Sequence, residues 1–103
     1  MSDTEPLPDA EVTVRWIVTG RVQGVSFRYF TQRAARALDL RGWVKNLADG
    51  SVEARVSGPR SRVEELREQV KQGPRLSRVD GVSEESIDSA AADVREGEFE
   101  IRF

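Results

Sequence analysis

The order of strand-like and helix-like patterns along this chain is the feature that most limits its fold. Apolar residues at every second position of residues 12–18 predict a strand. Apolar residues at helical spacing then predict a helix from near Arg28 to Leu38. Residues 42–47 and 52–56 read as two strands joined by the hairpin signal Asp49-Gly50. The first half therefore predicts strand, helix, strand, strand.

The second half repeats the pattern less regularly. Gly58-Pro59 ends the hairpin, and Ser61 with Glu64 forms a capping-box signal for a second helix that Gly73-Pro74 terminates. A strand is expected around residues 77–87, with an irregularity at Gly81. A polar loop from Asp88 and a short C-terminal strand carrying Phe99, Ile101 and Phe103 complete the chain.

This order predicts an α+β fold of the ferredoxin-like, split βαβ type: βαββαβ plus a C-terminal strand, in an antiparallel sheet with two helices on one face. The chain has 103 residues, enough for one core. We expect a single domain over residues 11–103 and a disordered tail over residues 1–10. Four large aromatic residues are expected in the core: Trp16, Phe27, Phe30 and Trp43.

Composition narrows the chemistry. The chain contains neither cysteine nor histidine, which excludes a thiolate nucleophile, a phosphohistidine route and most zinc sites. No apolar run reaches membrane-spanning length, and the first residues lack a signal-peptide pattern, so a cytoplasmic location is expected. Residues 12–57 carry a net charge of +5, whereas residues 76–103 carry −5. A positive first half suits a small anionic ligand, although a random surface distribution remains an alternative.

The loop between the first strand and the first helix, GRVQGVSFR from Gly20 to Arg28, is the first candidate site. Backbone N–H groups of such a loop, together with a helix N-terminus, form a site for a phosphate-like anion. Arg28 stands where the helix begins, and its planar guanidinium can grip two phosphate oxygens. The plainer interpretation is that Gly20 and Gly24 serve turn geometry and that Arg28 is a surface residue.

Asn46 is the second candidate. Asparagine is uncommon in strands, and its amide can both donate to and accept from a water molecule. Asn46 lies late on the strand predicted after the first helix, so it could face the loop that opens that helix. Lys45, one residue earlier, would point to the other face of the sheet. The alternative is an ordinary turn residue before Asp49. Ser26 and Thr31 are minor candidate ligands, although hydroxyls near helix starts usually act as caps.

The loop Gly20–Arg28, followed by GWVKNLADGSVE at residues 42–53, resembles the acylphosphatases. The resemblance implies hydrolysis of an acyl phosphate to a carboxylate and inorganic phosphate without metal or cofactor. It implies that Arg28 binds the phosphate and that Asn46 orients the attacking water. It also implies phosphate binding by the loop amides of Gln23, Gly24, Val25, Ser26, Phe27 and Arg28. Asp39 departs from the family, which commonly has glycine there, and a small loss of stability is expected.

We therefore expect a metal-independent hydrolase whose partner is a small acyl phosphate and whose product, inorganic phosphate, inhibits competitively. No nucleic acid or membrane partner is expected, and a monomer is favoured. The alternative is a non-catalytic ferredoxin-like module that binds phosphorylated metabolites or RNA. Retention of both Arg28 and Asn46 argues against that alternative.

Overall fold

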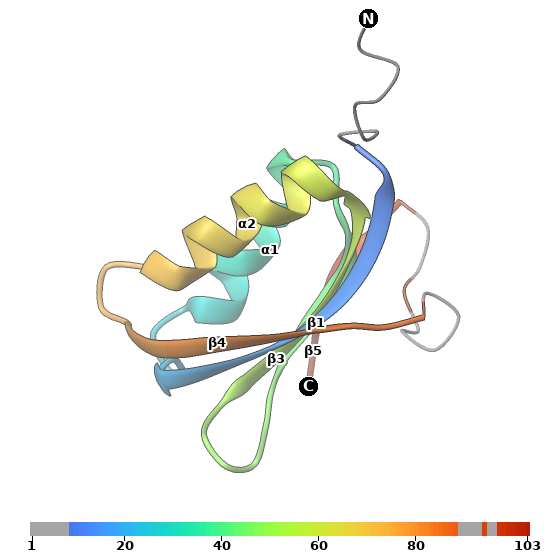
Figure 1. Ribbon diagram of the computed structural model, residues 1–103. Coiled ribbons are helices and arrows are strands. Elements are labelled where there is room, and N and C mark those ends of the chain that lie inside the picture. Colours follow the sequence, from blue (N-terminus) through green and yellow to red (C-terminus); the bar gives the residue numbers. More distant parts are fainter. Residues whose placement is uncertain (1–8, 89–93, 95–96) are drawn as a thin grey trace, which may run out of the picture.

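The computed structural model describes residues 9–88, 94 and 97–103. Two helices lie on the same side of a five-stranded sheet, as Figure 1 shows. In chain order the elements are β1 (Glu11–Arg21), α1 (Phe27–Ala37), β2 (Arg41–Asn46), β3 (Val52–Pro59), α2 (Arg60–Gln72), β4 (Arg78–Ser86) and β5 (Phe99–Arg102). The predicted α+β, ferredoxin-like order is confirmed.

The sheet has the strand order β4-β1-β3-β2-β5. All neighbouring strands run antiparallel except β2 and β5, which pair in parallel from Gly42↔Phe99 to Lys45↔Arg102. The prediction of a wholly antiparallel sheet is therefore wrong. The reason is topological: β5 runs opposite to β4, but it joins the far edge of the sheet, where β2 points the same way.

A single apolar core lies between the sheet and the helices. α1 packs over β2 and β5, while α2 packs over β3 and β4. Trp16 and Phe27 belong to this core, as predicted, whereas Phe30 is only half-buried. The alternation read from the sequence holds in β1, where Val14, Trp16 and Val18 all face the helices.

Trp43 is buried at 4 % exposure, but it lies outside this core. It is on the helix-free face of the sheet, opposite Arg55 in the neighbouring strand. The cationic groups of Lys45, Arg55 and Arg102 lie 4.9–5.6 Å from its ring. The expected core position is therefore corrected: charged side chains cover this ring, because Trp43 alternates with the core residue Val44.

The helix boundaries differ slightly from the predictions. α1 begins at Phe27, one residue before Arg28. α2 begins at Arg60 with Pro59 as its N-cap, and no side chain caps it. The predicted capping box is therefore wrong, because the Ser61 hydroxyl donates to the Asp9 carboxylate instead. The Arg60 N–H donates to the Ala10 carbonyl at 3.1 Å, so residues 9 and 10 contact the start of α2.

The irregularity expected in β4 is present. The pairing of β1 with β4 shifts register between Thr19 and Gly20, opposite Gly81 and Val79. The rest of the predicted tail, residues 1–8, lies outside the described residues, as does most of the predicted loop after Asp88. Among the residues that are described, neither helix is long and apolar enough to cross a membrane.

Candidate active site

The backbone of the loop between β1 and α1 includes a conformation that its local sequence does not explain. Gly24 has φ +75°, and Ser26, the N-cap of α1, has φ +64°. A left-handed conformation is costly for a serine, so the surrounding fold must hold it there. Within the described chain, no hydrogen bond uses the N–H groups of Gly24, Val25 or Ser26. These donors, with those of the first helical turn, remain available to an anion.

Arg28 lies in the first turn of α1, which contains no acidic residue. Its Nη1 donates to the Arg102 carbonyl oxygen at 3.0 Å, and its guanidinium carbon lies 4.7 Å from the centre of the Phe103 ring. Both contacts come from the end of the chain, at and just beyond β5. Phe103 is 98% exposed, so the hydrogen bond is the firmer of the two contacts, and it uses one of the five N–H donors of the guanidinium. The other donors are free to hold an anion.

Asn46 is the last residue of β2, and its side-chain oxygen is the most informative atom of the site. Oδ1 is buried, yet it accepts no hydrogen bond from any described residue. Leaving a buried acceptor unpaired costs about 1–3 kcal/mol. Such an atom therefore calls for a donor that the protein itself does not provide, and water is the simplest one.

One pocket of about 200 Å³ unites these groups. Gly24, Ser26, Phe27, Arg28 and Asn46 all line it. Gln23 and Val25 do not: Val25 packs against the apolar core, and the Gln23 side chain turns toward the hairpin between β2 and β3. Five of the seven predicted site residues thus share one cavity, and the other two flank it.

Comparison with known proteins gives this pocket its context. The sequence model described as Acylphosphatase matches residues 14–101. This chain belongs to the acylphosphatase family. The acylphosphatase of Koribacter versatilis is 46% identical over 92% of this chain and 84% of its own. That of Salinibacter ruber is 52% identical over 82% and 86%. The crystal structure of the Bacillus subtilis acylphosphatase superposes with a TM-score of 0.82 at 40% identity, covering 89% of this chain and 99% of that one.

Three residues of this acylphosphatase pocket were not predicted from the sequence: Tyr29, Ile101 and Phe103. Val22 also lines it and lies in the candidate loop Gly20–Arg28, although it was not named as a ligand. Tyr29 directly follows Arg28 and is 56% exposed at the pocket. Its position directly after Arg28 could have identified it as a residue of the candidate site. Ile101 and Phe103 come from the C-terminal segment, which reaches the site only because β5 pairs with β2. No local pattern indicated that pairing.

Neither of the two candidate hydroxyl residues, Ser26 and Thr31, caps α1 with its side chain. Ser26 occupies the N-cap position of α1 but makes no capping hydrogen bond with its side chain, and it lines the pocket. Thr31 is buried, and its hydroxyl donates to the Phe27 carbonyl at 3.0 Å within α1. Thr31 does not line the pocket, whereas Ser26 does.

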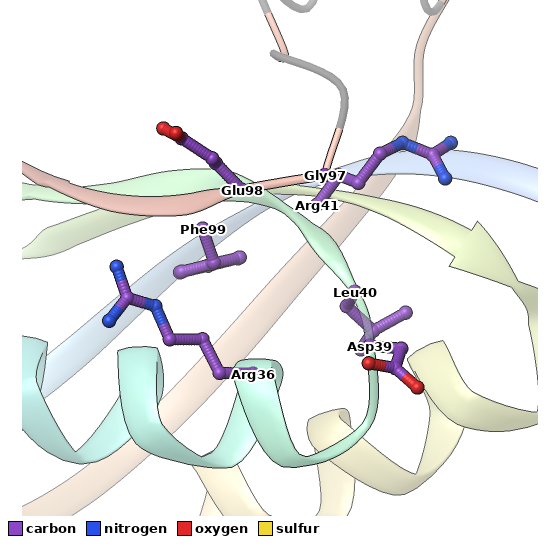
Figure 2. Close-up of a pocket in the computed structure, with 7 residues that line it drawn as sticks. All are labelled: Arg36, Asp39, Leu40, Arg41, Gly97, Glu98 and Phe99. Atoms are coloured by element: carbon purple, nitrogen blue, oxygen red, sulfur yellow. The ribbon is translucent and has the colours of Figure 1, made fainter.

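A larger pocket, about 560 Å³, lies at the other end of α1 (Figure 2). Its lining includes two cationic residues, Arg36 and Arg41, of which Arg41 is paired with Glu11 at 2.7 Å, and two acidic residues, Asp39 and Glu98. The C-terminal end of a helix carries partial negative charge, which disfavours an anion. The positive and negative residues of this lining balance, and the helix end disfavours an anion, so size alone does not single this pocket out as a site for phosphate.

Proposed function

We propose that this acyl phosphate hydrolase uses Arg28 and the loop amides to bind the phosphoryl group and Asn46 to orient the attacking water. Membership in the acylphosphatase family carries the reaction class. The observation that carries the assignment of residues is the unpaired, buried Oδ1 of Asn46 in the same pocket as Arg28.

Phosphate binding follows from the donors that the loop leaves unused. The N–H groups of Gly24, Val25 and Ser26 and the positive end of α1 favour a multiply charged anion. The amides of Gln23, Phe27 and Arg28 extend the same set. Arg28 adds a planar fork that meets two oxygens together. Because inorganic phosphate presents the same oxygens, we expect it to inhibit competitively.

The role of Asn46 follows from the chemistry of its unpaired atom, Oδ1, which is a hydrogen-bond acceptor. A carbonyl-type oxygen accepts an O–H from water, which leaves a water lone pair free to attack phosphorus. The new bond joins the water oxygen to phosphorus, and the bond between phosphorus and the acyl oxygen breaks. The carboxylate leaves with the electron pair of that bond, and the proton of the water passes to a phosphoryl oxygen. The products are a carboxylate and inorganic phosphate.

This reaction makes modest demands on the protein. A carboxylate is a stable leaving group, so no strong general acid is required. Charge spreads over the phosphoryl oxygens in the transition state, and fixed donors stabilise that charge. A chain without histidine or cysteine can supply all of this with arginine, asparagine and amides. We expect turnover to persist in the presence of a chelator, with a cytoplasmic monomer as the working form.

No observation favours the non-catalytic alternative. An RNA-binding sheet of this topology needs exposed aromatic side chains on its open face. Trp43 on that face is covered by three cationic side chains and is only 4% exposed. We therefore expect no nucleic acid partner.

The test is hydrolysis of a simple aryl acyl phosphate by the purified protein, with and without Asn46→Ala. The variant loses the acceptor that holds the water, so kcat should fall by about 10²-fold or more, because a misplaced reactant costs about that much in rate. The inhibition constant of inorganic phosphate should stay within a few-fold of that of the unmodified enzyme, since Arg28 and the loop N–H groups are intact. A turnover close to that of the unmodified enzyme would refute the water-positioning role.

A further inference from the structure

The Gln23 side chain joins the phosphate loop to the hairpin that follows Asn46. Its Nε2 donates to the Leu47 carbonyl oxygen and to the Ser51 carbonyl oxygen, both at 2.8 Å. Both hydrogens of one amide nitrogen are therefore used on the same hairpin. The side chain is half-buried, so these two bonds are partly shielded from water.

The two carbonyl oxygens that Gln23 contacts also accept the backbone hydrogen bonds that close the hairpin turn. The Leu47 N–H donates to the Ser51 carbonyl at 2.8 Å, and the Gly50 N–H donates to the Leu47 carbonyl at 3.2 Å. The Asp49 carboxylate accepts from both the N–H and the hydroxyl of Ser51, and the hydroxyl bond is chiefly what holds the pKa of Asp49 below its ordinary value. Gln23 therefore donates to a hairpin turn that its own hydrogen bonds already hold in place.

The position of this bridge in the chain matters for the site. Gln23 immediately precedes Gly24 in the loop, and Leu47 immediately follows Asn46. The bridge thus connects the backbone that presents the phosphate donors to the backbone that presents Oδ1. We propose that Gln23 is a positioning residue that sets the separation between the bound phosphoryl group and the water held by Asn46.

This inference rests on the proposed function, because it gives Asn46 the water. Proximity effects are steep: a misplacement of about 1 Å costs up to about 10²-fold in rate. The Gln23 side chain does not line the pocket, so loss of its Nε2 donor should lower kcat through Asn46 and leave the backbone N–H groups that bind phosphate nearly unaffected.

The experiment compares Gln23→Met, which keeps length but removes the donor, with Gln32→Met. Gln32 is a matched control, since its Nε2 donates to the Phe99 carbonyl at 3.2 Å from a half-buried position in α1 outside the pocket. We expect Gln23→Met to lower kcat about tenfold, with the inhibition constant of inorganic phosphate changed less than about threefold. Gln32→Met should leave both nearly unchanged.

A double-mutant cycle separates positioning from a merely structural role. In the Asn46→Ala background, Gln23→Met should lower kcat by less than about twofold, because the water it would position is no longer held. If Gln23→Met lowers kcat equally in both backgrounds, Gln23 does not act through Asn46 and the inference fails. If Asn46→Ala alone leaves kcat unchanged, the proposed function fails instead.

Gln23→Glu provides a second readout in case the methionine variant is poorly folded. The carboxylate would face two carbonyl oxygens and cannot donate, whereas its protonated form regains one donor. The ratio of its kcat to that of the unmodified enzyme should therefore rise as pH is lowered. A ratio independent of pH would argue against the bridge.

Discussion

The guanidinium of Arg28 stands at the end of α1 where the helix dipole is positive and where the first turn holds no acidic residue. A cation there is unfavourable unless an anion joins it. The Arg102 carbonyl and the Phe103 ring contact the guanidinium and leave most of its donors unused. At the scale of one residue, this is a side chain whose environment is incomplete without a ligand.

Arg28→Lys tests the planar fork, because lysine keeps the charge but not the geometry. We expect kcat/KM to fall by roughly 10²-fold, with both KM and kcat affected, since one ammonium cannot hold two oxygens in a fixed plane. Steady-state kinetics and inhibition by inorganic phosphate measure the effect. Unchanged phosphate inhibition in this variant would contradict the assignment of Arg28 to phosphate binding.

Asp39 follows α1 with φ +56°, in the left-handed region that glycine adopts more readily. It also places a carboxylate at the negative end of the helix, and its exposed ion pair with Arg62 at 3.6 Å contributes little. We expect Asp39→Gly to stabilise the protein by about 0.5–1 kcal/mol, which raises Tm by a few degrees.

Asp39→Ala is the control for this prediction, since it removes the charge but keeps the Cβ atom. It should stabilise less than Asp39→Gly. Thermal unfolding of the three proteins measures the order, and kcat should be the same in all of them. A Tm for Asp39→Gly below that of the unmodified protein would show that the backbone strain is not the dominant effect.

At the scale of elements, Glu53 links two central strands. It lies on β3 with its side chain almost wholly buried, and its Oε2 accepts from Arg15 on β1 at 2.8 Å and from Arg55 at 3.0 Å. Burial raises the pKa of Glu53, but the hydrogen bonds from Arg15 and Arg55 outweigh burial, so its pKa lies below the ordinary 4.5. The folded state therefore favours the charged form.

The consequence for stability has a definite sign. A carboxyl with a lowered pKa stabilises the fold above about pH 4.5, and this stabilisation is lost as pH falls through the lowered value. We expect Glu53→Gln to destabilise the protein at pH 7 by roughly 1.5–3 kcal/mol, the range for hydrogen bonds to charged groups. Urea unfolding at a series of pH values measures this difference. It should shrink as pH falls through the lowered pKa of Glu53, below the ordinary 4.5, whereas a constant difference would refute the linkage.

At the scale of the whole molecule, the distribution of charge is uneven. The chain has a net charge of −2, yet residues 12–57 carry +5, and this half contains the loop, α1 and Asn46. Long-range attraction of an anion toward the site is reduced by salt, whose screening length is about 10 Å at 0.1 M.

We therefore expect kcat/KM for an acyl phosphate to fall about threefold to tenfold between low salt and about 0.5 M sodium chloride, mainly through KM. Sodium gluconate at the same ionic strength should have the same effect, which separates screening from competition by chloride for the anion site. A constant kcat/KM would show that the charge asymmetry does not assist binding.

The order of elements and most of the candidate site were readable from the sequence. Periodicity and turn signals depend on neighbours a few residues apart, so α1 and β2 were predicted within one residue. β1 and β3 each run three residues beyond their predicted ends, to Arg21 and Pro59. The loop from Gly20 and the isolated Asn46 were identified by residue chemistry. The Ser61 capping box failed because Asp9, distant in sequence, takes its hydroxyl.

Local sequence patterns were therefore enough for the alternation of strands and helices, for the α+β class and for the residue types able to hold a phosphate. Only the tertiary structure decided that β5 joins β2 in parallel, which brings Arg102 and Phe103 to Arg28 and leaves Trp43 on the open face. It also decided that Gln23 bonds the hairpin after Asn46. The physical reason is that strand pairing and side-chain reach are set by which edges and acceptors remain free once the chain has folded, whereas periodicity reports only each segment's own faces.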